Sequence, residues 1–138
     1  MFNGEVLSFS ISDRPNFKSI SDALNEAINI TKDCPYRRIF HSDQGWAYQM
    51  NKYNKTLKKN KIFQSMSHKG TCLDNSPMEN FFGIMKQEMY YRKTYKSFNE
   101  LEKAITEYIY YYNNKRIKEK LNWRSPVKYR FEYESKVK

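Results

Sequence analysis

The sequence predicts an α/β domain in which short strands alternate with amphipathic helices. Its length of 138 residues suits one domain with a real core. Apolar runs of strand length alternate with segments whose apolar residues recur at helical spacing. Neither a repeat nor a low-complexity linker divides the chain. We therefore expect one domain over residues 1–132, followed by a frayed C-terminal tail over residues 133–138.

The chain opens with a predicted turn and strand. Asn3-Gly4 is a dipeptide typical of hairpin turns, and residues 5–12 after it alternate as a strand does. A hairpin turn needs a strand before it, and only Met1 and Phe2 precede this one. The pattern indicates a chain that begins in the middle of a domain.

The central region is expected to alternate helices with short strands. The periodicity predicts helices over about residues 17–31 and 46–59, strands over about 37–42 and 62–65, and a polar loop over 66–75. The first of these strands reads as buried and ends at Asp43, where Gln44-Gly45 turns the backbone away.

The C-terminal part is predicted to be helical. Ser76-Pro77 reads as the start of a helix whose apolar stripe consists of Met78, Phe81, Phe82, Met85 and Met89. Ser97 and Glu100 form a capping box for a long helix from residue 98 to about 115, with Tyr108 and Tyr112 on its buried stripe. Ser125-Pro126 then starts a last short turn or helix.

The charge of the chain favours a polyanionic partner. Lys and Arg number 25 against 15 Asp and Glu, which gives a net charge of +10. Residues 37–70 carry eight basic side chains and one acid, Asp43, so this stretch fits a surface that attracts nucleic acid. Lys58 and Lys59 are candidate contacts there, although a solvated lysine-rich helix face is the ordinary alternative.

The cysteines and the hydropathy bear on the compartment. Cys34 and Cys72 show no metal or redox spacing and are too few for a disulfide framework, which favours reduced thiols and a cytoplasmic protein. No apolar run approaches membrane-spanning length, and the N-terminus lacks the pattern of a signal peptide, so we expect no membrane partner.

Two carboxylates are the strongest functional signal. Asp43 and Glu79 are separated by thirty-five residues, and each stands at the end of a predicted element. Carboxylates brought together in this way suit Mg²⁺, which keeps positions free for water and phosphate oxygens. Each has a structural alternative: Asp43 as the acceptor in an Asx turn, and Glu79 as the partner of Ser76 in a capping box. Lys86 lies two helical turns beyond Glu79 and is either a phosphate contact or an ordinary exposed lysine.

Several motifs together resemble one family. They are His41-Ser42-Asp43-Gln44-Gly45, Ser65-Met66-Ser67-His68-Lys69-Gly70, the run from Asp74 to Phe82, Lys86-Gln87-Glu88, Tyr111-Tyr112-Asn113 with Arg116, and Ser125-Pro126. The chain resembles the integrase-core (DDE) domain of bacterial insertion-sequence transposases, the second-frame product type, in the retroviral-integrase superfamily. The likeness spans nearly the whole chain.

The resemblance implies a fold and a chemistry. The fold would be a ribonuclease-H-like mixed sheet with flanking helices, and Asp43 and Glu79 would be the second and third of three carboxylates that hold two Mg²⁺ or Mn²⁺ ions. The reaction would be attack of water, then of a DNA 3′-hydroxyl, on a phosphodiester. The partners would be element ends, target DNA and other transposase subunits. The residues expected to contact DNA are Lys58, Lys59, Lys69, Lys86 and Arg116.

The N-terminus departs from the family pattern. The family's first Asp lies on a strand upstream of the point where Met1 stands, and neither Glu5 nor Asp13 is placed to replace it. We therefore expect a truncated core without its first two strands. This leaves a second hypothesis, a catalytically inactive DNA-binding or subunit-association fragment that modulates full-length transposase. A nuclease of the same fold is a third, against which Lys86 and the tyrosine-rich C-terminal helix argue.

Overall fold

The computed structural model describes residues 2–70 and 76–138, and the chain divides into two compact units. Leu7–Met78 forms the first, which we call the strand unit. The N-terminal residues through Val6 combine with Glu79–Lys138 to form the second, which we call the helical unit.

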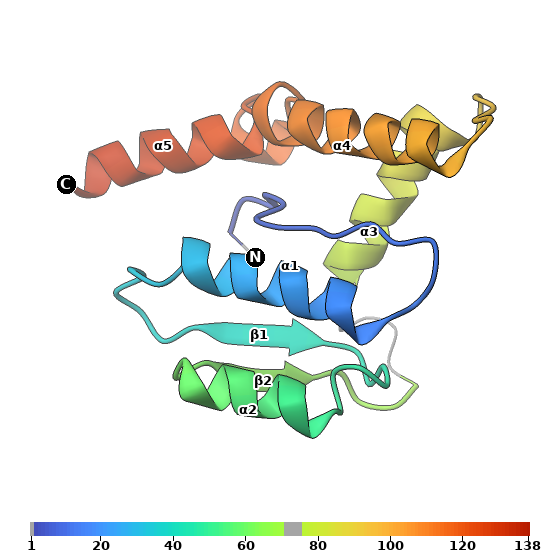
Figure 1. Cartoon of the computed structure of the whole chain (residues 1–138). Coiled ribbons are helices and arrows are strands. Elements are labelled where there is room, and N and C mark those ends of the chain that lie inside the picture. Colours follow the sequence, from blue (N-terminus) through green and yellow to red (C-terminus); the bar gives the residue numbers. More distant parts are fainter. Residues whose placement is uncertain (1, 71–75) are drawn as a thin grey trace. The chain divides into compact units, whose positions relative to one another are not determined.

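The strand unit contains a short parallel sheet. Its elements are, in order, α1 (Phe17–Ile30), β1 (Ile39–Ser42), α2 (Asn51–Lys59) and β2 (Phe63–Met66). The two strands point the same way in Figure 1, with Ile39 opposite Phe63 and Ser42 opposite Met66. Parallel neighbours need a crossover connection, and α2 supplies it. The predicted helices and strands are confirmed as elements. The bounds of α1 and β1 are slightly narrower than predicted, α2 begins at Asn51 and not near residue 46, and β2 lies one residue further along the chain than predicted.

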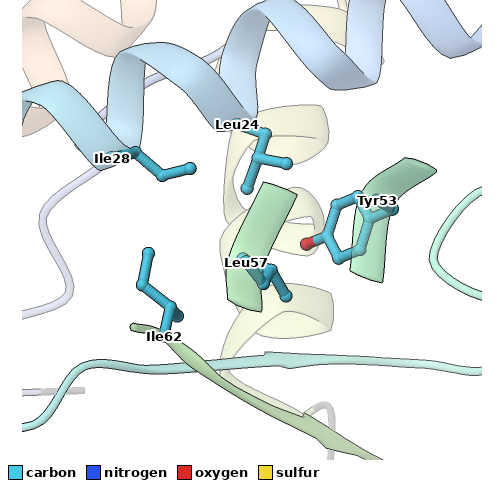
Figure 2. Packing of buried hydrophobic residues seen from close by; sticks show 5 residues of the cluster. All are labelled: Leu24, Ile28, Tyr53, Leu57 and Ile62. Carbon is cyan, nitrogen blue, oxygen red and sulfur yellow. The ribbon is translucent and has the colours of Figure 1, made fainter. Parts of the chain in front are cut away.

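One apolar cluster holds α1 and α2 together. Leu24 and Ile28 stand one turn apart on α1, as Tyr53 and Leu57 do on α2, so each pair occupies one helix face. Figure 2 shows these side chains gathered with Ile62. Leu57 is 1% exposed, and burial of a leucine side chain contributes about 2 kcal/mol. This cluster is the core of the strand unit.

Arg38 ties the C-terminal ends of the two helices. Its guanidinium donates to the carbonyl of Ile28 at 3.3 Å and to that of Asn60 at 2.6 Å. These carbonyls lie at helix ends, where backbone acceptors lack partners and the helix dipole is negative. Arg38 belongs to the basic stretch of residues 37–70, but its charge is used within the fold.

The strand that precedes Asp43 was expected to be buried, and this is wrong. Phe40 packs against the core cluster, whereas Ile39 is 59% exposed, and its partner Phe63 is 51% exposed. Side chains alternate across a strand, so Ile39 and Phe63 lie on the opposite face from Phe40. Among the described residues the sheet has two strands, and the unit's helices pack on the face of Phe40.

Among the described residues, the helical unit consists of a helix that changes from α to π winding, followed by three further helical segments. Its elements are α3 (Ser76–Met85), the π-helix η2 (Lys86–Tyr90), α4 (Phe98–Asn114), the 3₁₀ helix η3 (Glu119–Leu121) and α5 (Pro126–Val137). A second apolar cluster forms its core, made of Phe81, Met89, Tyr108, Ile109 and Tyr112. The prediction that Tyr108 and Tyr112 are buried is confirmed. Met78 and Phe82, which were placed on the apolar stripe of α3, are each 44% exposed.

The start of α4 agrees in part with the predicted capping box. The Ser97 hydroxyl accepts the Glu100 backbone N–H at 3.2 Å. The Glu100 carboxylate returns toward the chain before the helix and accepts the Lys96 N–H at 2.8 Å. Ser97 thus satisfies one backbone donor that the helix itself leaves unpaired, whereas Glu100 bonds the N–H one residue before the N-cap N–H that a capping box uses.

The C-terminal end departs from the sequence prediction. A short turn or helix and a frayed tail from residue 133 were expected, but α5 continues to Val137. An aromatic contact between Tyr133 and Phe2, with ring centroids 4.7 Å apart, supports this last part of the helix. The partner ring comes from the other end of the chain, so local sequence could not reveal it.

The predicted strand over residues 5–12 is also wrong. Those residues are extended but belong to no strand in the described structure. Val6 instead bonds a side chain: its N–H donates to Asn113 Oδ1 at 2.9 Å, and its carbonyl accepts Asn113 Nδ2 at 2.8 Å. The carboxamide thus satisfies the backbone groups that a strand partner would satisfy. Gly4 has φ +70°, which fits the predicted turn.

The sequence showed no apolar run of membrane-spanning length, and the helices of the structure can be examined for the same property. Within residues 2–70 and 76–138, no helix is both long enough and apolar enough to cross a membrane.

Candidate active site and nucleic-acid interface

Asp43 follows β1 directly and is held by the backbone of the next turn. Its Oδ1 accepts the Gly45 N–H at 2.8 Å, so the Asx turn considered for this residue is present. A Cβ added at Gly45 would stand 2.9 Å from the same Oδ1, so a larger residue here would force the Asp43 carboxylate to shift. Asp43 is exposed, and its other oxygen has no hydrogen-bond partner among the described residues. An Asx turn therefore leaves one oxygen available to a ligand.

Hydrogen bonds join the chain after β1 to the chain after β2. The His41 ring lies 2.9 Å from the Ser65 hydroxyl and 3.0 Å from that of Ser67. The Ser67 N–H donates to the Ser42 carbonyl at 2.9 Å, and Gln44 Nε2 donates to the Ser67 carbonyl at 3.0 Å. These bonds fix the sheet edge from which Asp43 projects.

Lys69 lies beyond the same edge as Asp43. The carboxyl ends of parallel strands meet at one edge of a sheet, and Lys69 follows β2 as Asp43 follows β1. Its side chain is exposed. Residues 71–75, the remainder of the predicted loop, lie outside the described residues, as does Cys72.

Tyr48 anchors the turn that carries Asp43. Its ring meets that of Tyr53 edge-on, with centroids 5.3 Å apart. Burial, and to a lesser extent the negative charge of Asp43, raise the pKa of Tyr48 above its usual value, and burial raises the pKa of Tyr53 to about 12. Both phenols therefore keep their protons at neutral pH, and they serve to pack the turn on the core.

Glu79 stands in the first turn of α3, and its carboxylate is exposed. The helix already begins at Ser76, whereas the capping-box reading placed Ser76 just before it. Among the described residues no hydrogen bond joins these two side chains to a backbone N–H of this turn. A negative charge at a helix N-terminus is favourable without such a bond. The carboxylate of Glu79 is therefore accessible to a ligand.

Lys86 begins the π-helix. The Tyr91 N–H donates to the Lys86 carbonyl at 2.9 Å, five residues back instead of four. The helix between Glu79 and Lys86 is α-helical, so the seven-residue spacing keeps both residues near one face. Lys86 is exposed. Single π turns inside helices occur frequently at functional sites.

Glu88 and Arg116 form an ion pair that sequence reasoning missed. Arg116 donates from Nη2 to Glu88 Oε1 at 2.7 Å and from Nε to both carboxylate oxygens, at 2.9 and 3.0 Å. The Tyr108 hydroxyl adds a hydrogen bond to Oε2 at 2.7 Å. In the sequence, Glu88 appeared only as the last residue of Lys86-Gln87-Glu88, and its partners lie twenty or more residues away.

This ion pair changes the interpretation of Arg116. The Arg116 hydrogen bonds lower the pKa of the Glu88 carboxyl, and Glu88 raises the pKa of Arg116 in turn. Arg116 therefore braces η2 against the C-terminal end of α4. A phosphate contact by Arg116 stays a prediction, and it would require this pair to open.

Lys58 and Lys59 are exposed in the last turn of α2. Leu57 beside them faces the core, so the lysines point toward solvent. Cations at this end of a helix also compensate its dipole, which is a structural reason for their presence. DNA contact by Lys58 and Lys59 stays a prediction.

The carboxylates fit a hard divalent cation by their chemistry. Among the described residues no side chain or backbone group bonds the second Asp43 oxygen, and Glu79 is exposed. Carboxylate oxygens are the ligands that Mg²⁺ and Mn²⁺ prefer. Asp43 belongs to the strand unit and Glu79 to the helical unit. Within the described residues, no three His, Cys, Asp or Glu side chains are grouped closely enough to hold a metal.

Comparison with known proteins shows the family. The integrase core domain matches residues 1–72, and a second integrase core domain pattern matches residues 79–132. The chain belongs to the integrase core family, as its motifs predicted.

The relatives in this family include insertion-sequence proteins. An uncharacterized transposase-like protein of Haemophilus influenzae is 48% identical over 130 residues, which cover 94% of this chain and 59% of the relative. The putative transposase InsK for insertion sequence element IS150 of Escherichia coli is 45% identical over 131 residues, covering 94% and 46%. The chain spans about half the length of these curated relatives.

A solved structure shows the fold. A chain in the cryo-EM structure of the simian T-cell lymphotropic virus intasome, in complex with the PP2A regulatory subunit B56 gamma, matches with a TM-score of 0.61 at 14% identity. The match covers 78% of this chain and 37% of that one. The predicted α/β, ribonuclease-H-like fold class is confirmed.

Proposed function

We propose that this chain supplies part of a transposase catalytic core that cleaves and joins phosphodiester bonds in DNA. The observation that carries the proposal is Asp43, which stands at the carboxyl edge of a parallel sheet with one oxygen fixed by Gly45 and the other available. Membership of the integrase core family and the net charge of +10 support DNA as the substrate.

Different side chains would bind the metal, position Asp43 and contact phosphate. Asp43 and Glu79 would hold Mg²⁺ or Mn²⁺, which when bound activates the attacking oxygen and stabilises the leaving oxygen. The hydrogen bonds around His41 and Ser67 keep Asp43 in position. Lys69, beyond the same sheet edge as Asp43, and Lys86, seven residues after Glu79, would neutralise phosphate oxygens next to the metal.

Metal binding by this chain can be tested without a cleavage assay. We expect Mn²⁺ to broaden the backbone amide signals of Gln44 and Asn80, the neighbours of the two carboxylates, in nuclear magnetic resonance spectra of the full chain. Asp43→Asn and Glu79→Gln should each reduce the broadening, because each removes an anionic ligand and little volume. Asp13→Asn, at an exposed acid away from both elements, is the matched control.

Cleavage separates the two functional hypotheses. If the chain acts as a catalyst, donor-end DNA is cut in Mg²⁺ or Mn²⁺, and both carboxylate variants abolish cutting while DNA affinity is kept. A chain that binds DNA and metal but never cuts, also when it is part of a protein as long as its relatives, supports the DNA-binding or subunit-association role. If Glu79→Gln retains cutting and mainly lowers thermal stability, Glu79 is a structural residue at the helix start.

A further inference from the structure

The segment that joins η2 to α4 places aromatic rings and cations on the surface together. Between residues 90 and 98 the chain carries Arg92, Lys93 and Lys96 and no acid. Tyr91 is 67% exposed and Tyr90 48%. Exposed aromatic rings occur elsewhere on the chain too, but here two adjacent rings stand in a run of cations that contains no acid.

These rings line an open pocket of about 490 Å³, which we call the tyrosine pocket; its walls include Tyr90, Tyr91, Lys93, Tyr95, Lys96 and Phe98. Every one of these residues belongs to the helical unit. The volume is within the range of sites that accept a ligand of the size of a nucleoside.

The pocket is built in advance of any ligand. The Tyr95 hydroxyl donates to the Met89 carbonyl, and Tyr95 packs against the helical core, so its ring is fixed. Tyr90 lies nearly parallel to it, at 16° with centroids 6.3 Å apart, and Tyr91 meets Tyr90 edge-on at 6.0 Å. The rings of Tyr90 and Tyr91 are thereby oriented while their outer surfaces stay accessible.

The cations are available to an anion. Among the described residues, Arg92, Lys93 and Lys96 form no salt bridge. The acid that lies closest in sequence after them, Glu100, uses its carboxylate to accept the Lys96 backbone N–H. Exposed aromatic faces beside unpaired cations match an unpaired base beside its phosphates, because every base offers a π-face and every linkage a negative charge.

We propose that the tyrosine pocket binds unpaired nucleotides of single-stranded DNA, with a base stacked on Tyr91 or Tyr90 and the flanking phosphates on Lys93 and Lys96. The proposal rests on the proposed function only in taking DNA as the partner. It adds a contact, remote in sequence from Asp43, that recognises frayed or cut ends and not intact duplex.

The experiment compares two labelled strands by fluorescence anisotropy with the full chain: short oligothymidine, and a strand of equal length made of abasic sites. The variants are Tyr91→Ala, Tyr90→Ala, Tyr91→Phe and the double change Lys93→Gln with Lys96→Gln. Tyr36→Ala is the control, since Tyr36 is 77% exposed in the strand unit and outside the pocket.

Tyr91→Ala or Tyr90→Ala should weaken oligothymidine binding at least about fivefold, the smallest effect typical of a lost base stack. Tyr91→Phe and Tyr36→Ala should bind as the unchanged protein does, and the abasic strand should not distinguish the tyrosine variants. The double lysine change should weaken both strands and reduce the salt dependence of binding.

The proposal is overturned if both alanine variants bind oligothymidine normally, or lose as much affinity for the abasic strand. It is also overturned if they change sedimentation but not DNA binding, because the pocket would then be a protein interface. Failure of the proposed function looks different: the unchanged chain would bind neither duplex nor single strands. If the unchanged chain binds duplex DNA and the tyrosine variants bind oligothymidine as it does, only the proposal for the tyrosine pocket is contradicted.

Discussion

Glu88 connects three parts of the helical unit through one carboxylate. It accepts hydrogen bonds from Arg116, just after α4, and from the buried Tyr108, about two helical turns before Arg116. Glu88 itself stands on η2, two residues after Lys86. The pair is partly shielded, with side chains 23% and 35% exposed, so it is worth more than a fully solvated surface ion pair. We infer that it holds η2, and with it Lys86, in place.

Glu88→Gln should lower the free energy of unfolding at neutral pH by about 1–2 kcal/mol, because charge-assisted hydrogen bonds are lost or weakened. The Arg116 hydrogen bonds lower the pKa of Glu88 below its ordinary 4.5, so the pair stabilises fully above that pH. This stability is lost as the pH falls through the lowered pKa. The difference between variant and unchanged protein in urea unfolding should therefore shrink under acid conditions.

The control for that measurement is Glu107→Gln. Glu107 is exposed on α4 and forms no salt bridge in the described part of the chain, so its change should leave stability nearly the same. A stability difference for Glu88→Gln that does not vary with pH would contradict the role of the charge.

At the scale of elements, Asn113 attaches the N-terminal segment to α4. Its carboxamide gives Val6 both backbone bonds, and Glu5 pairs with Arg130 of α5 at 2.8 Å. Asn113→Ala should cost about 1–3 kcal/mol, since the half-buried backbone groups of Val6 lose their partners. Faster amide hydrogen exchange at Val6 would report the detachment.

Asn114→Ala is the matched control for Asn113. The side chain of Asn114 is exposed and bonds only the Tyr110 carbonyl within its own helix, so little stability should be lost. Equal losses for the two variants would contradict a specific role for the link to Val6, since alanine favours a helix more than asparagine does.

The lysines of α2 and α5 give a test of where DNA lies. Charge reversal at Lys58 and Lys59 should lower duplex affinity more than reversal at Lys136 and Lys138, because the first pair stands in the basic stretch around Asp43. Binding of the unchanged chain should weaken steeply with salt, as each neutralised phosphate releases counterions. Affinity that stays flat between low and moderate salt, or equal effects of both reversals, would contradict this interface.

At the scale of the whole molecule, two features act in opposite directions on association between chains. The uncovered face and edge of β1 favour association, and the net charge opposes it. β1 pairs only with β2 among the described residues, and Ile39 and Phe63 are exposed beside each other. An open strand edge with apolar neighbours is a template for pairing between chains. The charge of +10 opposes association, and salt screens it.

We therefore expect self-association that strengthens with salt, whereas DNA binding weakens with salt. Ile39→Lys should suppress the association in sedimentation velocity, because a charge on an edge strand blocks pairing. Ile30→Lys, at an exposed apolar position of α1, is the control. A monomer over a wide range of concentration and salt would contradict the prediction.

The sequence by itself determined what depends on neighbours in the chain. Helical spacing of Leu24 and Ile28, the capping box at Ser97, the apolar run around Phe40 and the motif around Asp43 predicted most elements, the fold class and the family. The Asx turn of Asp43 also depends on a near neighbour in the chain, because its partner Gly45 is two residues away.

Only the tertiary structure decided contacts between distant segments. Whether residues 5–12 form a strand depends on which partner their backbone meets, and Val6 meets an amide 107 residues away. The end of α5 depends on the ring of Phe2, and the engagement of Arg116 depends on Glu88. Each of these contacts joins residues that are far apart in the sequence, so it forms only when the whole chain folds. A short periodic pattern or motif therefore does not reveal it.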